Sequence, residues 1–194
     1  MNLKPRREAT RAVVKKILIV CEGEQTEPNY FRSFRVSSQV CEVRGLGRNT
    51  ISLVKEAVKL NDRADYREVW CVFDKDSFQD SSVAAAFKLA AEHGFKVAFS
   101  NECFELWYVL HFDYLDAAVH RDVYVKRLKQ LLDGYEKNSA GVYDRLLANQ
   151  GQAIKHAKAL AKSHGADLSP AQRVPYTTVH DLVERLNKLA MVAR

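Results

Sequence analysis

The residues of this chain that could do chemistry are carboxylates that follow two short apolar runs. Glu22 comes directly after ILIVC at residues 17–21, and Asp74 and Asp76 follow VWCVF at residues 69–73. Each run is typical of a buried parallel strand, so the acids should emerge at the carboxyl-terminal edge of one sheet, where open α/β sheets bind their ligands. Carboxylates that lie this close repel one another unless a cation joins them.

A divalent ion with oxygen ligands is the cation that suits such a group. Mg²⁺ is bound in proteins by one or two carboxylates together with water and substrate phosphate. We therefore predict that Glu22, Asp74 and Asp76 bind Mg²⁺ or Mn²⁺. The alternative for either cluster taken alone is a helix cap or a first-turn charge, since Asp and Glu favour the amino-terminal ends of helices.

A third acidic segment, NECFELWYVLHF, begins at residue 101 after another apolar run. Ser100 or Asn101 is expected to cap a helix in this segment. Glu102 and Glu105 are three residues apart, so they should share a face of its first turn. Either glutamate could join the metal site, and a capping charge is the alternative role for each.

Strands and helices alternate along the first part of the chain, and this order must bring the acidic segments together. The apolar patterns predict strands at residues 16–21, 39–46, 68–73 and 95–100, and helices at residues 26–36, 50–60 and 80–93. Expected helix-end residues are Thr26, Asn49 or Thr50, and Gly94, and Gly45 and Gly47 are expected in a turn. The alternation predicts an α/β fold in which a small parallel sheet has helices on both faces.

No strand is predicted beyond residue 113. The patterns there predict helices at about 119–132, 141–163 and 178–191, with Thr177 or Thr178 as the cap of the last. Three tyrosines of this part are expected to pack in the core, and docking of a partner is the alternative role: Tyr124, Tyr135 and Tyr143. We expect a single domain over residues 1–194, with an α/β core at about 15–112 and a helical part at about 113–194.

Length and composition exclude several classes of protein. The chain has 194 residues and 47% hydrophobic content, which is enough for one well-buried core. The four cysteines show no CxxC spacing, so we expect reduced core residues rather than disulfides or a zinc site. The ILIVC run is too short for a signal peptide or a membrane span, and we expect a soluble, cytoplasmic protein with no membrane partner.

The net charge of +6 is distributed unevenly. Residues 1–60 carry 12 basic and 6 acidic side chains, residues 61–120 carry 5 and 11, and residues 121–194 carry 13 and 7. An acidic middle between two basic ends suits a polyanion such as nucleic acid, which Lys and Arg would hold while the metal acts on its backbone. The alternative is that these charges solvate helix faces. The predicted contacts are Arg44, Arg48, Lys126, Arg127 and Lys129, with a further basic arm at residues 1–16.

Several of these segments together make the chain resemble a known family. They are ILIVCEGEQTEPNYF at residues 17–31, VWCVFDKDSF at 69–78 and SNECFELWYVLHF at 100–112, followed by YDRLL, AIKHAKAL and TVHDLV. With these segments in this order, the chain resembles the RloB-like family of bacterial phage-defence proteins. The core of that family is similar to the Toprim fold of topoisomerases, primases and OLD-type nucleases.

The resemblance implies roles for individual residues. In Toprim proteins, a Glu after the first strand and a DxD motif after the third bind Mg²⁺ and assist phosphodiester transfer, which places these roles on Glu22, Asp74 and Asp76. Further positions that the resemblance marks are two acids of the site and one phosphate contact: Glu27, Glu105 and Lys137. Glu105 is preferred over Glu102, because Glu102 stands where the family pattern has proline.

The function that the resemblance implies is a metal-dependent nuclease for RNA or DNA, acting as the effector of an anti-phage or abortive-infection system. The resemblance implies an ATPase partner as well, since RloB-like and similar Toprim proteins are associated with ATPase partners in defence loci. The chain has no GxxxxGK[ST] motif with which to control itself. Two alternatives remain open. One is a Toprim-like module that binds nucleic acid or a partner without catalysis. The other is a haloacid-dehalogenase-like phosphatase, for which FDKDS supplies the nucleophile motif while the later Lys and the paired acidic motif are missing.

Overall fold

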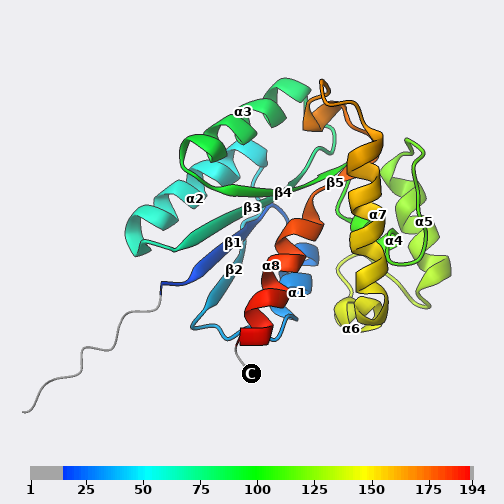
Figure 1. Ribbon diagram of the computed structural model, residues 1–194, viewed down its shortest axis with the longest axis horizontal. Helices are drawn as coiled ribbons and strands as arrows, with labels where there is room; N and C mark the ends of the chain where they lie inside the picture. Colours follow the sequence, from blue (N-terminus) through cyan, green and yellow to red (C-terminus); the bar gives the residue numbers. More distant parts are fainter. Residues whose placement is uncertain (1–14, 193–194) are drawn as a thin grey trace, which may run out of the picture.

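The computed structural model describes residues 15–192 as one five-stranded sheet with helices on both faces (Figure 1). The elements are β1 (Ile17–Cys21), α1 (Thr26–Arg32), β2 (Cys41–Gly45), α2 (Thr50–Ala64), β3 (Glu68–Asp74), α3 (Asp80–Glu92), β4 (Lys96–Asn101), α4 (Glu105–Val109), α5 (Arg121–Leu131), α6 (Val142–Leu146), η1 (Leu147–Asn149), α7 (Gln150–Ser163), η2 (Pro170–Gln172), β5 (Tyr176–Thr177) and α8 (Val179–Val192). The predicted basic arm lies outside the described residues except for Lys15 and Lys16.

The sheet has the strand order β2-β1-β3-β4-β5. The first four strands are parallel, and β5 pairs antiparallel with β4. Helices α2 and α3 cover one face, and α1, α4 and the C-terminal helices cover the other (Figure 1). The predicted α/β class, with a mostly parallel sheet and a helical C-terminal extension, is confirmed.

Strand β1 shows why the apolar runs form this sheet. All five of its residues are completely buried. Ile17 and Ile19 pack against α1 and the C-terminal helices, whereas Leu18 and Val20 pack under α2 and α3. A strand covered on both faces needs a continuous apolar run rather than an alternating one.

The predicted helix-end residues Asn49 and Gly94 are confirmed, but α2 continues to Ala64 rather than ending at residue 60. Both predicted ends of α1 are wrong. The Asn49 side chain accepts a hydrogen bond from the Ser52 amide at 3.3 Å, and Gly94 follows α3 with a φ of +67°. Thr26 is the first helical residue of α1 rather than its cap. This helix ends at Arg32 rather than residue 36, and beyond it the Ser33 hydroxyl donates to the Asn29 carbonyl.

The predicted start of the helix after β4 is also wrong. Ser100 and Asn101 do not cap a helix, because both belong to β4 and pair with β5. The Asn101 side chain donates to the carbonyls of Ala171 and Arg173, both at 2.8 Å. Helix α4 therefore starts only at Glu105, and its preceding residue makes no side-chain cap.

The C-terminal part is not purely helical. Strand β5 was not expected, because its two residues are too few to show a strand pattern. The helix expected at 141–163 is interrupted by η1, where Asn149 leaves the helical conformation. The Thr177 hydroxyl accepts from the Val179 amide at 3.2 Å at the start of α8, as expected of a cap.

The tyrosines of this part pack inside the protein. Tyr124, Tyr135 and Tyr143 are all buried and join one apolar cluster that also contains Ile17 of β1 and Leu186 of α8. Core packing is therefore their role, and the docking hypothesis is wrong for them. The four cysteines are likewise buried and free.

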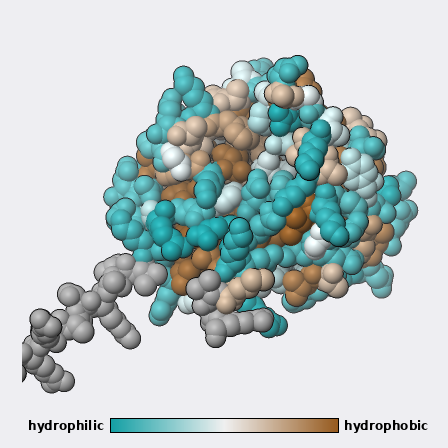
Figure 2. All heavy atoms as spheres, in the orientation of Figure 1, coloured by the Kyte–Doolittle hydropathy of each residue, from teal (hydrophilic) through white to brown (hydrophobic). Residues whose placement is uncertain are grey.

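The face seen in Figure 2 is covered mainly by hydrophilic residues, with smaller hydrophobic areas between them. Met191 on α8 is the most exposed large apolar side chain of the described residues, and it lines a surface pocket together with Leu147. Among the described residues, no helix is long and apolar enough to cross a membrane.

Candidate functional site

Glu22 and Asp74 lie side by side at the carboxyl-terminal edge of the sheet. Strands β1 and β3 are neighbours, with Cys21 opposite Val72, so the residues that follow them emerge together. The Glu22 amide donates to the Val72 carbonyl at 2.9 Å, and the Asp74 amide donates to the Glu22 carboxylate at 3.3 Å. The structure thus brings together these two of the predicted ligands.

Two further carboxylates reach the same place from helix starts. Glu27 in the first turn of α1 is 6% exposed, and Glu105 at the first position of α4 is 3% exposed. With Asp74 they line a cavity of about 90 Å³. The Asp74 carboxylate also accepts from the Phe104 amide at 3.0 Å, which ties the end of β3 to the loop before α4.

Two glycines allow the loop after β1 to fold tightly. A Cβ on Gly23 would lie 2.2 Å from the Glu27 carboxylate, so that carboxylate can turn back over the loop only because Gly23 has no side chain. Gly45 was expected in a turn but is the last residue of β2. A Cβ there would lie 2.6 Å from the Gly23 carbonyl oxygen and 2.7 Å from Pro28.

The carboxylates of this group are poorly compensated. Burial raises the pKa of Glu22 to about 7, with Glu27 and Asp76 adding repulsion and the Asp74 amide opposing it. Burial also raises the pKa of Asp74 well above its ordinary value, and the negative charges of Glu27, Glu105 and Glu22 add to the effect. Although part of the Asp74 surface reaches the cavity, surrounding protein atoms displace most of the water that would stabilise its charge.

The same two causes act on Glu27. Burial raises its pKa, Glu105 adds repulsion, and Lys137 opposes both. A set of hard oxygen donors that destabilise one another in this way fits a divalent ion such as Mg²⁺ or Mn²⁺ in its chemistry.

The third predicted ligand, Asp76, is turned elsewhere. Its carboxylate forms an ion pair with the Arg121 guanidinium. Its amide donates to the Glu102 carbonyl at 3.1 Å, and its φ is +45°. In the described part of the chain, no three His, Cys, Asp or Glu side chains are arranged to hold a metal ion. The predicted set of three ligands is therefore not assembled in this arrangement, and the ion stays a prediction.

Glu102 does not share a helical face with Glu105, because it lies in the loop before α4. Its carboxylate accepts a hydrogen bond from the Arg121 amide at the start of α5. Glu102 therefore anchors that helix, whereas Glu105 faces the acidic cavity. The preference for Glu105 agrees with this placement.

The C-terminal part of the chain supplies positive charge to the site. Lys137 and Arg121 line the cavity together with the acids. The Thr26 hydroxyl donates to the Asn138 side chain at 2.6 Å, which joins the Lys137 loop to the start of α1. Sequence reasoning missed Arg121. The available signal was an Arg at the first position of a helix, which is too common to single out a site.

The other predicted nucleic-acid contacts are spread over the surface. Arg44 pairs with Glu42 at 2.6 Å and Arg127 with Asp113 at 2.9 Å. Arg48 follows the carboxyl end of β2, and Lys126 and Lys129 are exposed on α5.

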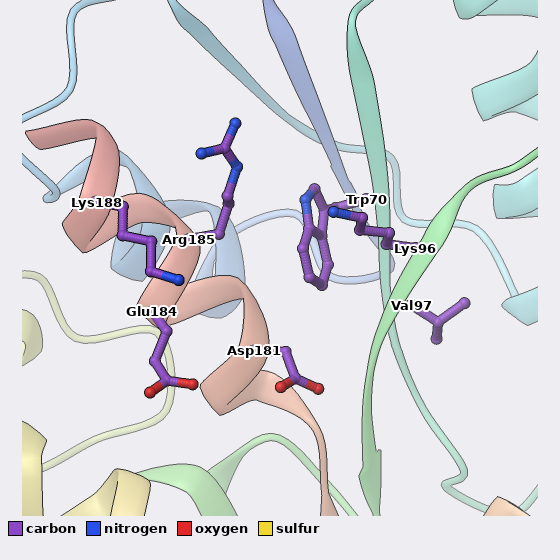
Figure 3. Close-up of a pocket in the computed structure, with 7 residues that line it drawn as sticks. All are labelled: Trp70, Lys96, Val97, Asp181, Glu184, Arg185 and Lys188. Atoms are coloured by element: carbon purple, nitrogen blue, oxygen red, sulfur yellow. The ribbon is translucent and has the colours of Figure 1, made fainter. Parts of the chain in front are cut away.

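A wider pocket of about 500 Å³ lies near the amino-terminal ends of β3 and β4, on the side of α8. Trp70 and Lys96 line it from the strands, and Asp181, Glu184, Arg185 and Lys188 line it from α8 (Figure 3). Its charges are largely paired: Lys96 and Arg185 each contact Glu68 at 2.9 Å, and Glu184 contacts Lys158 at 2.7 Å. The smaller acidic cavity differs from this pocket, because its acidic side chains outnumber its basic ones.

A family model described as RloB-like protein matches residues 17–186 of the chain. The matched stretch begins at the first residue of β1 and ends within α8, so it includes all the acids described above. No curated protein gives a significant match.

Proposed function

The chain belongs to the RloB-like protein family, and we propose that it is a metal-dependent nuclease whose site is the carboxylate group at the carboxyl edge of the sheet. The observation that supports this function best is the convergence of Glu22, Glu27, Asp74 and Glu105 from three separate segments of the chain. Burying uncompensated carboxylates costs stability, so their presence together favours a functional role that requires them.

In this proposal Glu22 and Asp74 hold the ion, with Asp76 as the third ligand. Mg²⁺ or Mn²⁺, when bound, polarises a nonbridging phosphate oxygen and lowers the pKa of a bound water. Burial raises the pKa of Glu22 in the metal-free protein, and the alternative role of its carboxylate, in place of binding the ion, is general base for the attacking water. Lys137, at the rim of the cavity, holds a nonbridging phosphate oxygen.

Turnover of nucleic acid tests the catalytic part of the proposal. Purified protein with Mn²⁺ or Mg²⁺ is expected to cleave plasmid DNA or a structured RNA, and Asp74→Asn should abolish the cleavage. Asp62→Asn is the matched control, because Asp62 is an exposed acid on α2 whose change removes the same charge.

The other two functions are distinguishable in the same assays. Binding of nucleic acid without any cleavage, in protein that binds Mn²⁺, would favour the non-catalytic binding module. Release of phosphate from a small phosphomonoester, with no action on nucleic acid, would favour the phosphatase.

Nucleic-acid binding through the basic side chains is part of the proposal and has its own test. If about four phosphates of duplex DNA are neutralised, the logarithm of the binding constant should fall against the logarithm of salt concentration with a slope near −3.6. The residues to test are Arg44, Arg48, Lys126, Arg127, Lys129 and Lys137. A DNA-binding constant that does not change with salt concentration would exclude a polyanionic ligand.

The role as effector of a defence system, gated by an ATPase partner, is proposed from the family resemblance. The chain has no nucleotide-binding P-loop with which to control itself. Coexpression with an ATPase encoded beside it should change cell toxicity in a way that depends on Asp74. If the chain alone is as toxic as the chain with the ATPase, and the toxicity depends on Asp74, the nuclease proposal stands and control by the ATPase is excluded.

A further inference from the structure

We propose that Arg121 exchanges partners at this site: it holds Asp76 while the metal is absent and binds a substrate phosphate once Asp76 turns to the metal. The inference rests on the proposed function, because it requires that Asp76 becomes a ligand of a divalent ion. It explains why the predicted ligand set is not assembled, and it assigns Arg121 as a residue that positions the substrate.

Arg121 is fixed at its backbone and free at its side chain. The Arg121 amide donates to the Glu102 carboxylate, which anchors the start of α5 beside the end of β4. The guanidinium pairs with Asp76, and the side chains of the two residues are 28% and 42% exposed. The guanidinium can therefore change its partner by rotation of side-chain bonds without any movement of α5.

Both partners are within reach of Arg121 from this one position. Arg121 lines the acidic cavity together with Asp74 and Glu105, whereas Asp76 does not line it. The negative charge of Glu105 also acts on the Arg121 guanidinium. A phosphate bound over these acids would thus lie beside a guanidinium that is already in place.

The exchange is favourable for both groups. An ion pair between partly exposed side chains is weak, so a divalent ion can compete with it for the Asp76 carboxylate. A released guanidinium is well suited to phosphate, because its planar donors can form two parallel hydrogen bonds with two phosphate oxygens. Among the described residues, Arg121 is the one ion-pair partner of Asp76, so the exchange disturbs no larger network.

Metal affinity tests the first half of the exchange. Arg121→Gln should bind Mn²⁺ more tightly than the unchanged protein, by up to about fivefold in calorimetry, because the cation that competes for Asp76 is gone. Arg63→Gln is the matched control, since Arg63 is exposed at the end of α2 and its change removes the same charge. This control should leave Mn²⁺ affinity unchanged.

Binding of nucleic acid tests the second half. In Ca²⁺, chosen as a probe with which cleavage can be checked to be absent, Arg121→Gln should bind duplex DNA about tenfold more weakly than Arg63→Gln. The slope of its log binding constant against log salt concentration should be smaller in magnitude by about 0.9, the value for one phosphate contact. Arg121→Lys should recover the slope but only part of the affinity, because Lys keeps the charge without the paired donors.

The outcomes separate this inference from the proposed function. Mn²⁺ affinity that is unchanged or weaker in Arg121→Gln would overturn the competition, and unchanged DNA binding would overturn the phosphate contact. If the unchanged protein binds no Mn²⁺, the proposed function fails instead. Should Arg121→Gln misfold, Arg121→Lys and Asp76→Asn still report on the pair. Their effects on the melting temperature should be non-additive without Mn²⁺ and additive with it.

Discussion

Strand β3 carries a carboxylate at each end, and the two have opposite surroundings. At the amino-terminal end, burial alone would raise the pKa of Glu68, but hydrogen bonds from Lys96, Trp70 and Arg185 outweigh it, and the net pKa is lowered. At the carboxyl-terminal end, burial and three neighbouring carboxylates raise the pKa of Asp74. The same strand thus holds one acid in a compensated network and one in an uncompensated cluster.

The comparison separates an acid that is paired within the fold from one that we propose to be functional. Glu68 is 12% exposed on its side chain, and its two ion pairs join β3 to β4 and to α8. Asp74 lies beside Glu22, Glu27 and Glu105 without such partners. A buried acid that stabilises the fold is paired, whereas acids that repel one another call for a ligand.

The largest expected effect is on activity, at the carboxyl-terminal end. Asp74→Asn should lower Mn²⁺ affinity and cleavage by at least about 100-fold, because even residues that only support metal ligands cost 10- to 100-fold. The melting temperature of the metal-free protein should not fall, since a repulsive charge is removed. Calorimetry and plasmid cleavage measure these effects. A variant that unfolds while Asp62→Asn does not would show that Asp74 is structural.

The next effect is on stability, at the amino-terminal end. Glu68→Gln should lower the free energy of unfolding by about 2–3 kcal/mol, because it leaves Lys96 and Arg185 without their charged hydrogen-bond acceptor. Chemical denaturation measures this loss, and Glu92→Gln on the exposed end of α3 is the control. Mn²⁺ affinity of the folded protein should not change. A loss of Mn²⁺ affinity would contradict the separation of the two ends.

A smaller effect is expected where β2 packs against the loop that carries Glu22. Gly45→Ala should cost about 1–2 kcal/mol of stability, because its Cβ would lie 2.6 Å from the Gly23 carbonyl oxygen, and it should weaken Mn²⁺ binding as the loop shifts. Gly151→Ala in α7 is the control. Apart from its chain neighbours and the backbone of its own helix, no atom lies within 4 Å of the Cβ position, so this change should be neutral or stabilising. Unchanged Mn²⁺ affinity in Gly45→Ala would show that the loop position is not required.

The smallest effect is a dependence on pH. The folded-state pKa of Glu22 is raised from 4.5 to about 7, so its charge destabilises the metal-free protein above pH 7 and has no such effect below pH 4.5. Glu22→Gln should therefore stabilise the metal-free protein by about 1 kcal/mol at pH 8, after allowance for solvent screening, and by nothing at pH 4.5. Comparing the two proteins at each pH cancels the titration of buried histidines. If Glu22→Gln increases the stability equally at pH 4.5 and pH 8, the raised pKa of Glu22 is contradicted.

The position of Glu22 and Asp74 could be predicted because it depends on local pattern. Continuous apolar runs identify β1 and β3, and parallel neighbours must present their carboxyl ends at one edge. The helix ends at Asn49 and Gly94 were predictable for the same reason, since their bonds join residues only a few positions apart. Glu27, in contrast, was marked only by the family resemblance.

The sequence by itself therefore determined the α/β class, the parallel strands and the acids that end them. Only the tertiary structure decided that β5 returns to β4, that Glu102 anchors α5, and that Arg121 pairs with Asp76. Asp76 and Arg121 are 45 positions apart, and Ser100 and Thr177 are 77 apart. Contacts over such separations leave no periodic pattern in either segment, because they depend on how finished helices and strands pack against one another.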